Sequence, residues 1–179
     1  MSTLRVNAIN NQDGGTKFYD GSPSFDLWRL TANFTTNDTT ITGWERPDTP
    51  TGIITNLNGL SETSSNSGIF TFPSTGIYHI TIHFNGVQSS GSDTSMGGSI
   101  MISTDSGSNF TRCALSYAAG DTDGGNNNGA SATAFFNVTD TSTFQLSFKS
   151  ESLSSGSFLG GNTGYNYTTF TSIKLAPIQ

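Results

Sequence analysis

The stretch that decides the fold reads Gly68-Ile-Phe-Thr-Phe-Pro-Ser-Thr-Gly-Ile-Tyr-His-Ile-Thr-Ile-His-Phe84. In its second half, apolar residues recur at every second position, and those on the more apolar side are Tyr78, Ile80, Ile82 and Phe84. Successive side chains of a strand point to opposite faces, so a period of two is typical of a β-strand. The stretch therefore predicts a central strand of a sheet.

Shorter alternating segments fill the rest of the chain after Ser24, separated by clusters of Gly, Asn, Asp and Pro. They cover residues 28–34, 100–102, 110–117, 134–138, 144–148 and 169–175, with the longest loop expected at 120–129. Short strands at such spacing are typical of a sandwich or barrel, and no long window has the period of an amphipathic helix. We therefore expect an all-β, antiparallel jelly-roll sandwich of about eight to ten strands with almost no helix.

Ser, Thr, Asn and Gly together make up about half of the 179 residues. Disordered chains share that bias, but they are usually highly charged and poor in aromatic residues. This chain has 13 Phe, 5 Tyr and 2 Trp, and only 11% of its residues are charged. The composition instead indicates strands whose outer faces carry uncharged polar side chains.

Charge and cysteine content exclude several partners. The net charge is −6 and the seven basic residues are scattered, whereas nucleic-acid binding needs clustered Lys and Arg. No run approaches the roughly 18 apolar residues of a membrane span. The single cysteine, Cys113, excludes an internal disulfide and zinc sites of the Cys-x-x-Cys type. We expect neither nucleic acid nor membrane as a partner.

Residues 1–24 differ in pattern from the rest of the chain. Beyond Leu4, Val6 and Ile9 they show little alternation, and the segment 10–15 is rich in turn-forming residues. We interpret residues 1–24 as an N-terminal arm and residues 25–179 as one domain, a size that suits a single hydrophobic core.

Three motifs resemble the complement globular-head and tumour-necrosis-factor-like jelly rolls. The segment 68–84 is similar to the central strand pair of that family, with its aromatic pair, Pro, turn Gly and alternating strand. The stretch Phe136-Asn-Val-Thr-Asp-Thr-Ser-Thr-Phe-Gln-Leu146 is similar to the penultimate hairpin, although Thr139-Asp140 replaces the family's Gly-Asp turn. Phe170-Thr-Ser-Ile-Lys-Leu175 is similar to the final strand. The resemblance implies a trimer.

Two further segments carry a narrower resemblance, which bears on where the protein acts. Met1-Ser-Thr-Leu-Arg-Val-Asn-Ala-Ile9 and Trp44-Glu-Arg-Pro-Asp48 resemble parts of tailed-phage fibre and virion surface proteins, particularly of cyanobacterial phages. This implies a homotrimer on the virion surface, assembled in the host cytoplasm. We expect a head decoration or cement protein or a short fibre, attached through Leu4, Val6 and Ile9 to the major capsid or tail proteins. The alternative is the receptor-binding tip of a tail fibre, which recognises host carbohydrate.

The second side of the central strand carries Ile77, His79, Thr81 and His83. A strand that faces water more often carries Lys, Glu or Thr than an Ile and two His, so we expect these four residues at the trimer interface. A spacing of four binds zinc on a helix, but on a strand it separates the histidines by about 13 Å. Packing at the interface is favoured over an ion shared by three copies.

Other candidate sites are weaker. Asp121 and Asp123 lie in a Gly-rich loop and offer oxygen ligands for calcium, although no EF-hand spacing accompanies them. Trp44 and Arg46 could form an exposed platform for sugars, and Asn126, Asn127 and Asn128 could form a ligand loop. Solvated loops and a core tryptophan are the competing interpretations.

No catalytic constellation is visible. The sequence has three Glu and two His, and it lacks a Gly-x-Ser-x-Gly elbow, a P-loop and a dinucleotide fingerprint. We expect no enzymatic activity and no cofactor.

Overall fold

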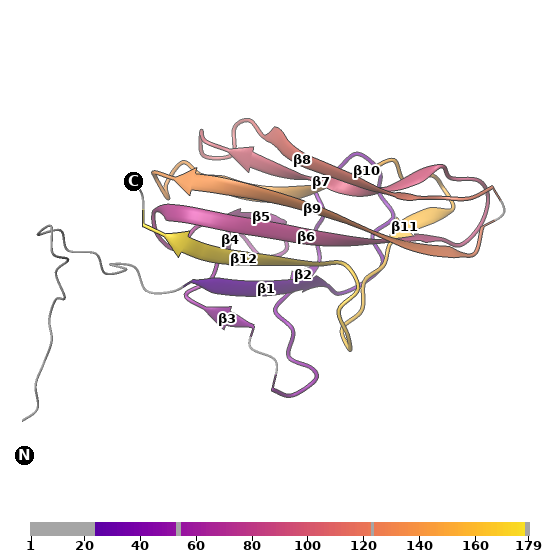
Figure 1. The fold of residues 1–179 in the computed structure, drawn as a ribbon, viewed down its shortest axis with the longest axis horizontal. Helices are drawn as coiled ribbons and strands as arrows, with labels where there is room; N and C mark the ends of the chain where they lie inside the picture. Colours follow the sequence, from indigo (N-terminus) through magenta and orange to yellow (C-terminus); the bar gives the residue numbers. More distant parts are fainter. Residues whose placement is uncertain (1–23, 53–54, 123, 178–179) are drawn as a thin grey trace, which may run out of the picture.

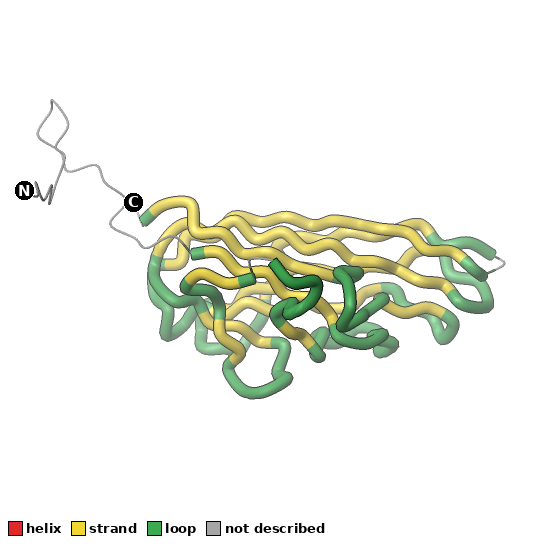
Figure 2. The backbone as a smooth tube through the Cα atoms, turned by 90° about the horizontal axis from the view of Figure 1, so that it is seen from below, coloured by secondary structure: helices red, strands yellow, loops and turns green. Residues whose placement is uncertain are grey.

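A computed structural model describes residues 24–52, 55–122 and 124–177 of the chain, and within these ranges the secondary structure is entirely β. Two antiparallel sheets pack into a sandwich (Figures 1 and 2). None of the described residues lies in a helix long and apolar enough to cross a membrane. The all-β sandwich predicted from the alternating segments is therefore confirmed.

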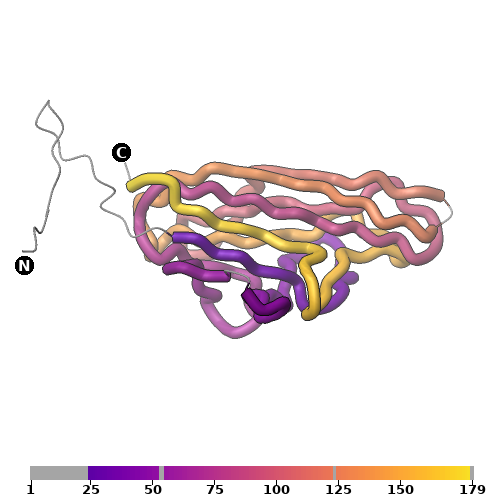
Figure 3. The backbone as a smooth tube through the Cα atoms, turned by 60° about the horizontal axis from the view of Figure 1, so that its bottom comes forward, coloured from indigo at the N-terminus to yellow at the C-terminus, as the bar shows by residue number. Residues whose placement is uncertain are grey.

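The larger sheet contains seven strands. Its main path is β11 (Ser157–Leu159), β6 (Gly76–Gln88), β12 (Thr169–Ala176), β1 (Phe25–Leu30) and β2 (Trp44–Glu45); β9 (Asn126–Val138) pairs with β6, and β3 (Asn56–Leu57) pairs with β1. Figure 3 shows β1, β12, β6 and β9 side by side along the front of the molecule.

The smaller sheet follows the order β4 (Ser61–Glu62), β5 (Ile69–Thr71), β10 (Gln145–Glu151), β7 (Ser95–Ser103) and β8 (Thr111–Ala119). The described residues thus form twelve strands rather than eight to ten. The difference arises because β2, β3 and β4 have two residues each, too few to show a period in the sequence.

Aromatic rings from both sheets meet in the core. Trp28 of β1 and Phe170 of β12 face Phe70 of β5 and Phe148 of β10, with ring centroids 4.4 Å apart for Phe148 and Phe170 and 5.0 Å apart for Phe70 and Phe170. The inward side of β6, from Tyr78 to Phe84, is fully buried at every second residue. Burial of these rings is the main stabilisation of the sandwich.

Two expected boundaries were wrong. The first strand ends at Leu30, and Phe34, expected on it, instead pairs with Leu159 through two backbone hydrogen bonds of 2.9 Å. The expected loop at 120–129 is shorter, because β9 begins at Asn126 and pairs with β6 over thirteen residue pairs. Pairing with a long neighbour extends a strand into a polar, Gly-rich segment that carries little propensity of its own.

The hairpin between β7 and β8 turns at residues 104–108. The carboxylate of Asp105 accepts hydrogen bonds from Asn109 Nδ2 (2.7 Å), from Ser103 Oγ (2.7 Å) and from the backbone N of Asn109 (2.9 Å). These bonds stabilise the charged form and lower the pKa of Asp105 to about 2. The turn therefore keeps its capping charge over the whole range in which proteins are ordinarily studied.

Candidate functional site

The open face of the larger sheet, the side turned away from the core, is the main candidate surface. Strand register aligns its side chains in three rows across β1, β12, β6 and β9: Phe25, Ile173, His79 and Phe135; then Leu27, Thr171, Thr81 and Thr133; then Arg29, Thr169, His83 and Ser131. Together with Ile77 and Leu175, these residues define the open face. The first row is mainly apolar and aromatic, the second carries mainly hydroxyl groups, and the third is polar throughout.

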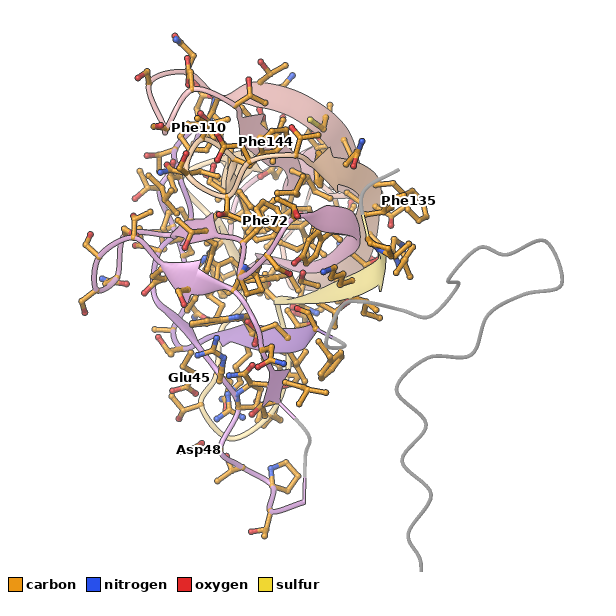
Figure 4. The ribbon with its side chains drawn as sticks, turned by 90° about the vertical axis from the view of Figure 1, so that its left-hand side faces the viewer. Glu45, Asp48, Phe72, Phe110, Phe135 and Phe144 are labelled. Carbon is orange, nitrogen blue, oxygen red and sulfur yellow. The ribbon has the colours of Figure 1, made fainter. Side chains whose placement is uncertain are left out.

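The first row exposes apolar surface to water. The Phe135 side chain is 64% exposed and projects away from the sandwich (Figure 4), and Ile173 and Leu175 are 37% and 42% exposed. His79 stacks on the Phe135 ring, with centroids 4.6 Å apart and planes inclined by 14°. Exposed apolar patches of this kind mark interaction surfaces.

The two histidines are held by hydroxyl groups of β9. His79 Nε2 lies 2.8 Å from Thr133 Oγ1, and His83 Nδ1 lies 3.1 Å from Ser131 Oγ. The His83 ring lies over Gly129, where a Cβ atom would come within 2.5 Å of its Cε1. Neighbours in the sheet therefore fix both rings.

The far end of the open face is closed by the segment after β2. Arg29 is fully buried although it lies in the third row; its Nε donates to Glu45 (2.7 Å), its Nη2 to Asp48 (2.9 Å) and its Nη1 to the Thr49 carbonyl (2.8 Å). Figure 4 shows Glu45 and Asp48 near the rim of the sandwich, on the side away from Phe135. The guanidinium thus ties this segment to β1.

Trp44 and Arg46 do not form the exposed sugar platform that we expected from the sequence. Trp44 is only 7% exposed, packs edge-to-face against the core ring of Phe170 and donates its indole N–H to the Ile41 carbonyl (2.9 Å). Arg46 binds the Asp26 carboxylate through two hydrogen bonds, of 2.8 and 3.0 Å, and lies over the Trp28 ring. Both side chains are used inside the fold, so the prediction was wrong for them.

The Asn126–Asn128 segment is likewise not a ligand loop, because it is the beginning of β9. Asn126 Nδ2 donates to Asp121 Oδ2 (3.0 Å) and Asn128 Nδ2 donates to the Ala119 carbonyl (2.6 Å). Only Asn127 is exposed among the three. Two of these amides therefore each use an N–H to tie the start of β9 to the end of β8 or to the segment after it.

Of the two calcium candidates, Asp121 lies among the described residues. Hydrogen bonds from the Thr122 backbone N–H and from Asn126 occupy the Asp121 carboxylate and lower its pKa, and the buried Gln88 amide binds the Asp121 backbone. Asp123 lies outside the described residues. Within the described ranges, no group of three or more His, Cys, Asp or Glu side chains could hold a metal ion.

Sequence reasoning missed two exposed aromatic features. Phe135 lies beside His79, and its outward direction followed from the parity that places Phe136 inward. Tyr165 and Tyr167 lie on the loop between β11 and β12, 49% and 38% exposed, with ring centroids 4.7 Å apart. No periodic signal in the sequence marked that loop. The proposed attachment residues Leu4, Val6 and Ile9 lie outside the described residues.

Comparisons with known proteins bear on the fold. No family model matches the chain, and no curated protein matches its sequence. Among solved structures, Eiger TNF from S. frugiperda is similar with a TM-score of 0.59 and 11% identity, covering 87% of this chain and 96% of that one. Murine APRIL at pH 8.0 is similar with a TM-score of 0.56 and 12% identity, covering 86% of this chain and 99% of that one. The chain therefore has a TNF-like jelly-roll fold.

Proposed function

We propose that the chain is a non-enzymatic structural protein of a phage particle, displayed on its surface as a homotrimer, either as a head decoration or cement protein or as a short fibre. The open face carries the assembly part of this proposal. Its apolar row is exposed in the single chain, and on β6, β9 and β12 it presents no Asp, Glu, Lys or Arg. A surface without charge can be buried by identical copies with little electrostatic cost.

The wider composition supports display at high density. Only 11% of residues are charged, so few charged side chains need to lose water where copies pack together. Attachment to the particle is assigned to Leu4, Val6 and Ile9 in the arm, on the resemblance of residues 1–9 to virion surface proteins. The partners at that end are then major capsid or tail proteins.

Deleting residues 2–20 tests this assignment. We expect the truncated protein to remain a folded trimer, because the open face and the core lie within residues 24–177. Incorporation into particles should fall to background, measured by antibody labelling of purified virions. The same labelling on intact particles locates the full chain at head, collar or tail. Truncated protein present at full occupancy would contradict attachment through the arm.

A receptor-binding role has one observation in its favour, the exposed pair Tyr165 and Tyr167. Their loop is fixed, since Asn162 N donates to the Leu30 carbonyl (2.8 Å) and Thr49 Oγ1 donates to the Thr163 carbonyl (2.9 Å). Exposed aromatic rings on a rigid loop beside amide groups suit the faces of sugar rings. This pair replaces Trp44 as the candidate for contact with host carbohydrate.

The double substitution Tyr165→Ala/Tyr167→Ala should lower adsorption of particles to host cells at least about tenfold if the chain is a tip, because both stacking rings are lost. Adsorption is measured as the rate at which free particles disappear from a mixture with cells. Tyr117→Ala, which removes an exposed ring from β8, is the matched control. Equal adsorption rates for particles with the wild-type protein, the double variant and the control would exclude the tyrosine pair as the contact with host carbohydrate.

A further inference from the structure

Both histidine rings of the open face are held by hydroxyl groups. His79 Nε2 lies 2.8 Å from Thr133 Oγ1 and 3.3 Å from Thr81 Oγ1, and Thr133 Oγ1 can also donate to the Ile80 carbonyl (3.0 Å). His83 Nδ1 lies 3.1 Å from Ser131 Oγ. Among the described residues, neither ring forms an ion pair with a carboxylate.

No negative charge on the open face would compensate a charged imidazole. The neighbours of His79 and His83 on β6, β9 and β12 are hydroxyl, amide, aliphatic and aromatic side chains, and Tyr167 is the one titratable group that continues the β12 row. Arg29, at the end of the third row, is bound to Glu45 and Asp48. Lys174 of β12 donates to Ser74 Oγ (3.0 Å).

From this geometry we infer that assembly of the trimer is pH-sensitive and weakens on acidification, with His79 and His83 as the sensing groups. The inference rests on the proposed function, since it assumes that the open face is the interface. In the separate chain both rings reach water, which stabilises the charged form. In the proposed trimer six imidazoles leave water, and the open face itself offers no carboxylate to pair with them, so assembly favours the neutral rings.

Proton linkage determines the direction in which the strength of the trimer changes with pH. Histidine ordinarily changes its charge between about pH 5 and 8. The separate chains bind more protons than the trimer in this range, so the trimer is strongest above it and weakens as the pH falls through it. Hydrogen bonds lower the pKa values of Asp38, Asp93, Asp105, Asp121 and Asp140, so these five carboxylates contribute little to a change between pH 7.5 and pH 5.

Sedimentation equilibrium of the full chain at pH 7.5 and at pH 5.0, at equal ionic strength, tests the inference. We expect the concentration of half-dissociation to rise at least about tenfold at pH 5.0. The double variant His79→Gln/His83→Gln keeps hydrogen-bonding side chains but cannot gain charge, so its trimer should respond less than threefold. Circular dichroism at both pH values checks that each protein remains folded.

The outcomes separate the two proposals. A monomer at pH 7.5 would overturn the proposed assembly itself. A wild-type trimer of equal strength at both pH values would overturn the inference and leave the trimer standing. An unchanged pH response in the double variant would also overturn it, since other groups would then be responsible. If the double variant is monomeric at pH 7.5, the single variants decide: each should show a smaller pH response than the wild type.

Discussion

The substitution Phe135→Glu should convert the proposed trimer into a folded monomer at micromolar concentration. The ring is 64% exposed in the single chain and, among the described residues, stacks on His79 outside the core, so the core does not depend on it. At an interface between copies, burial of such a ring contributes about 1.5–3 kcal/mol for each copy. An unpaired carboxylate buried in its place costs more, and the cost recurs three times around the axis.

Sedimentation equilibrium gives the mass, and thermal unfolding shows whether the subunit still folds. Ser65→Glu adds the same charge at an exposed position in the turn between β4 and β5 and should leave the trimer intact. A Phe135→Glu protein that remains trimeric at micromolar concentration would exclude the open face as the interface. A wild-type protein that is monomeric under the same conditions would exclude the trimer altogether.

The sequence was sufficient for the sandwich because alternation is a local property. Within seven residues, the alternation identifies the side of the strand that faces the core. Its members are all fully buried: Tyr78, Ile80, Ile82 and Phe84. The same alternation placed Ile77, His79, Thr81 and His83 on the opposite side, where the structure has them. Their role in a trimer stays a prediction, because the parity of a strand says which side a residue faces and not what covers it.

Relations between distant strands could not be predicted. His79 meets Phe135 because β6 and β9 pair in one register over thirteen residue pairs, and nothing local to either strand specifies that register. The burial of Trp44 could not be predicted either. Its strand has two residues, so no period in the sequence distinguishes a core ring from an exposed one. The buried charges were missed for a related reason, since Arg29 and Asp26 look like surface residues until their partners are known.

We expect the substitution Arg46→Ala to lower the free energy of unfolding more than any other substitution proposed above. Asp26 is fully buried, and Arg46 Nε and Nη2 donate to its two carboxylate oxygens at 2.8 and 3.0 Å. Arg46 also donates to the Leu60 carbonyl (2.5 Å) and lies 4.3 Å above the Trp28 ring. Removing one partner of a buried ion pair leaves a charge without compensation, which costs about 3–5 kcal/mol. That is a large part of the 5–15 kcal/mol typical of a domain.

Urea unfolding at a constant subunit concentration measures this loss, because oligomerisation makes apparent stability concentration-dependent. Arg46→Lys keeps the charge but loses the two-pronged contact, so its loss should be smaller. Asp26→Asn/Arg46→Met should be more stable than Arg46→Ala, since it buries no unpaired charge. Lys149→Ala breaks an ion pair in which Asp38 is largely exposed and should change little. An Arg46→Ala protein within about 1 kcal/mol of the wild type would show that water reaches Asp26 and that the pair contributes little to the fold.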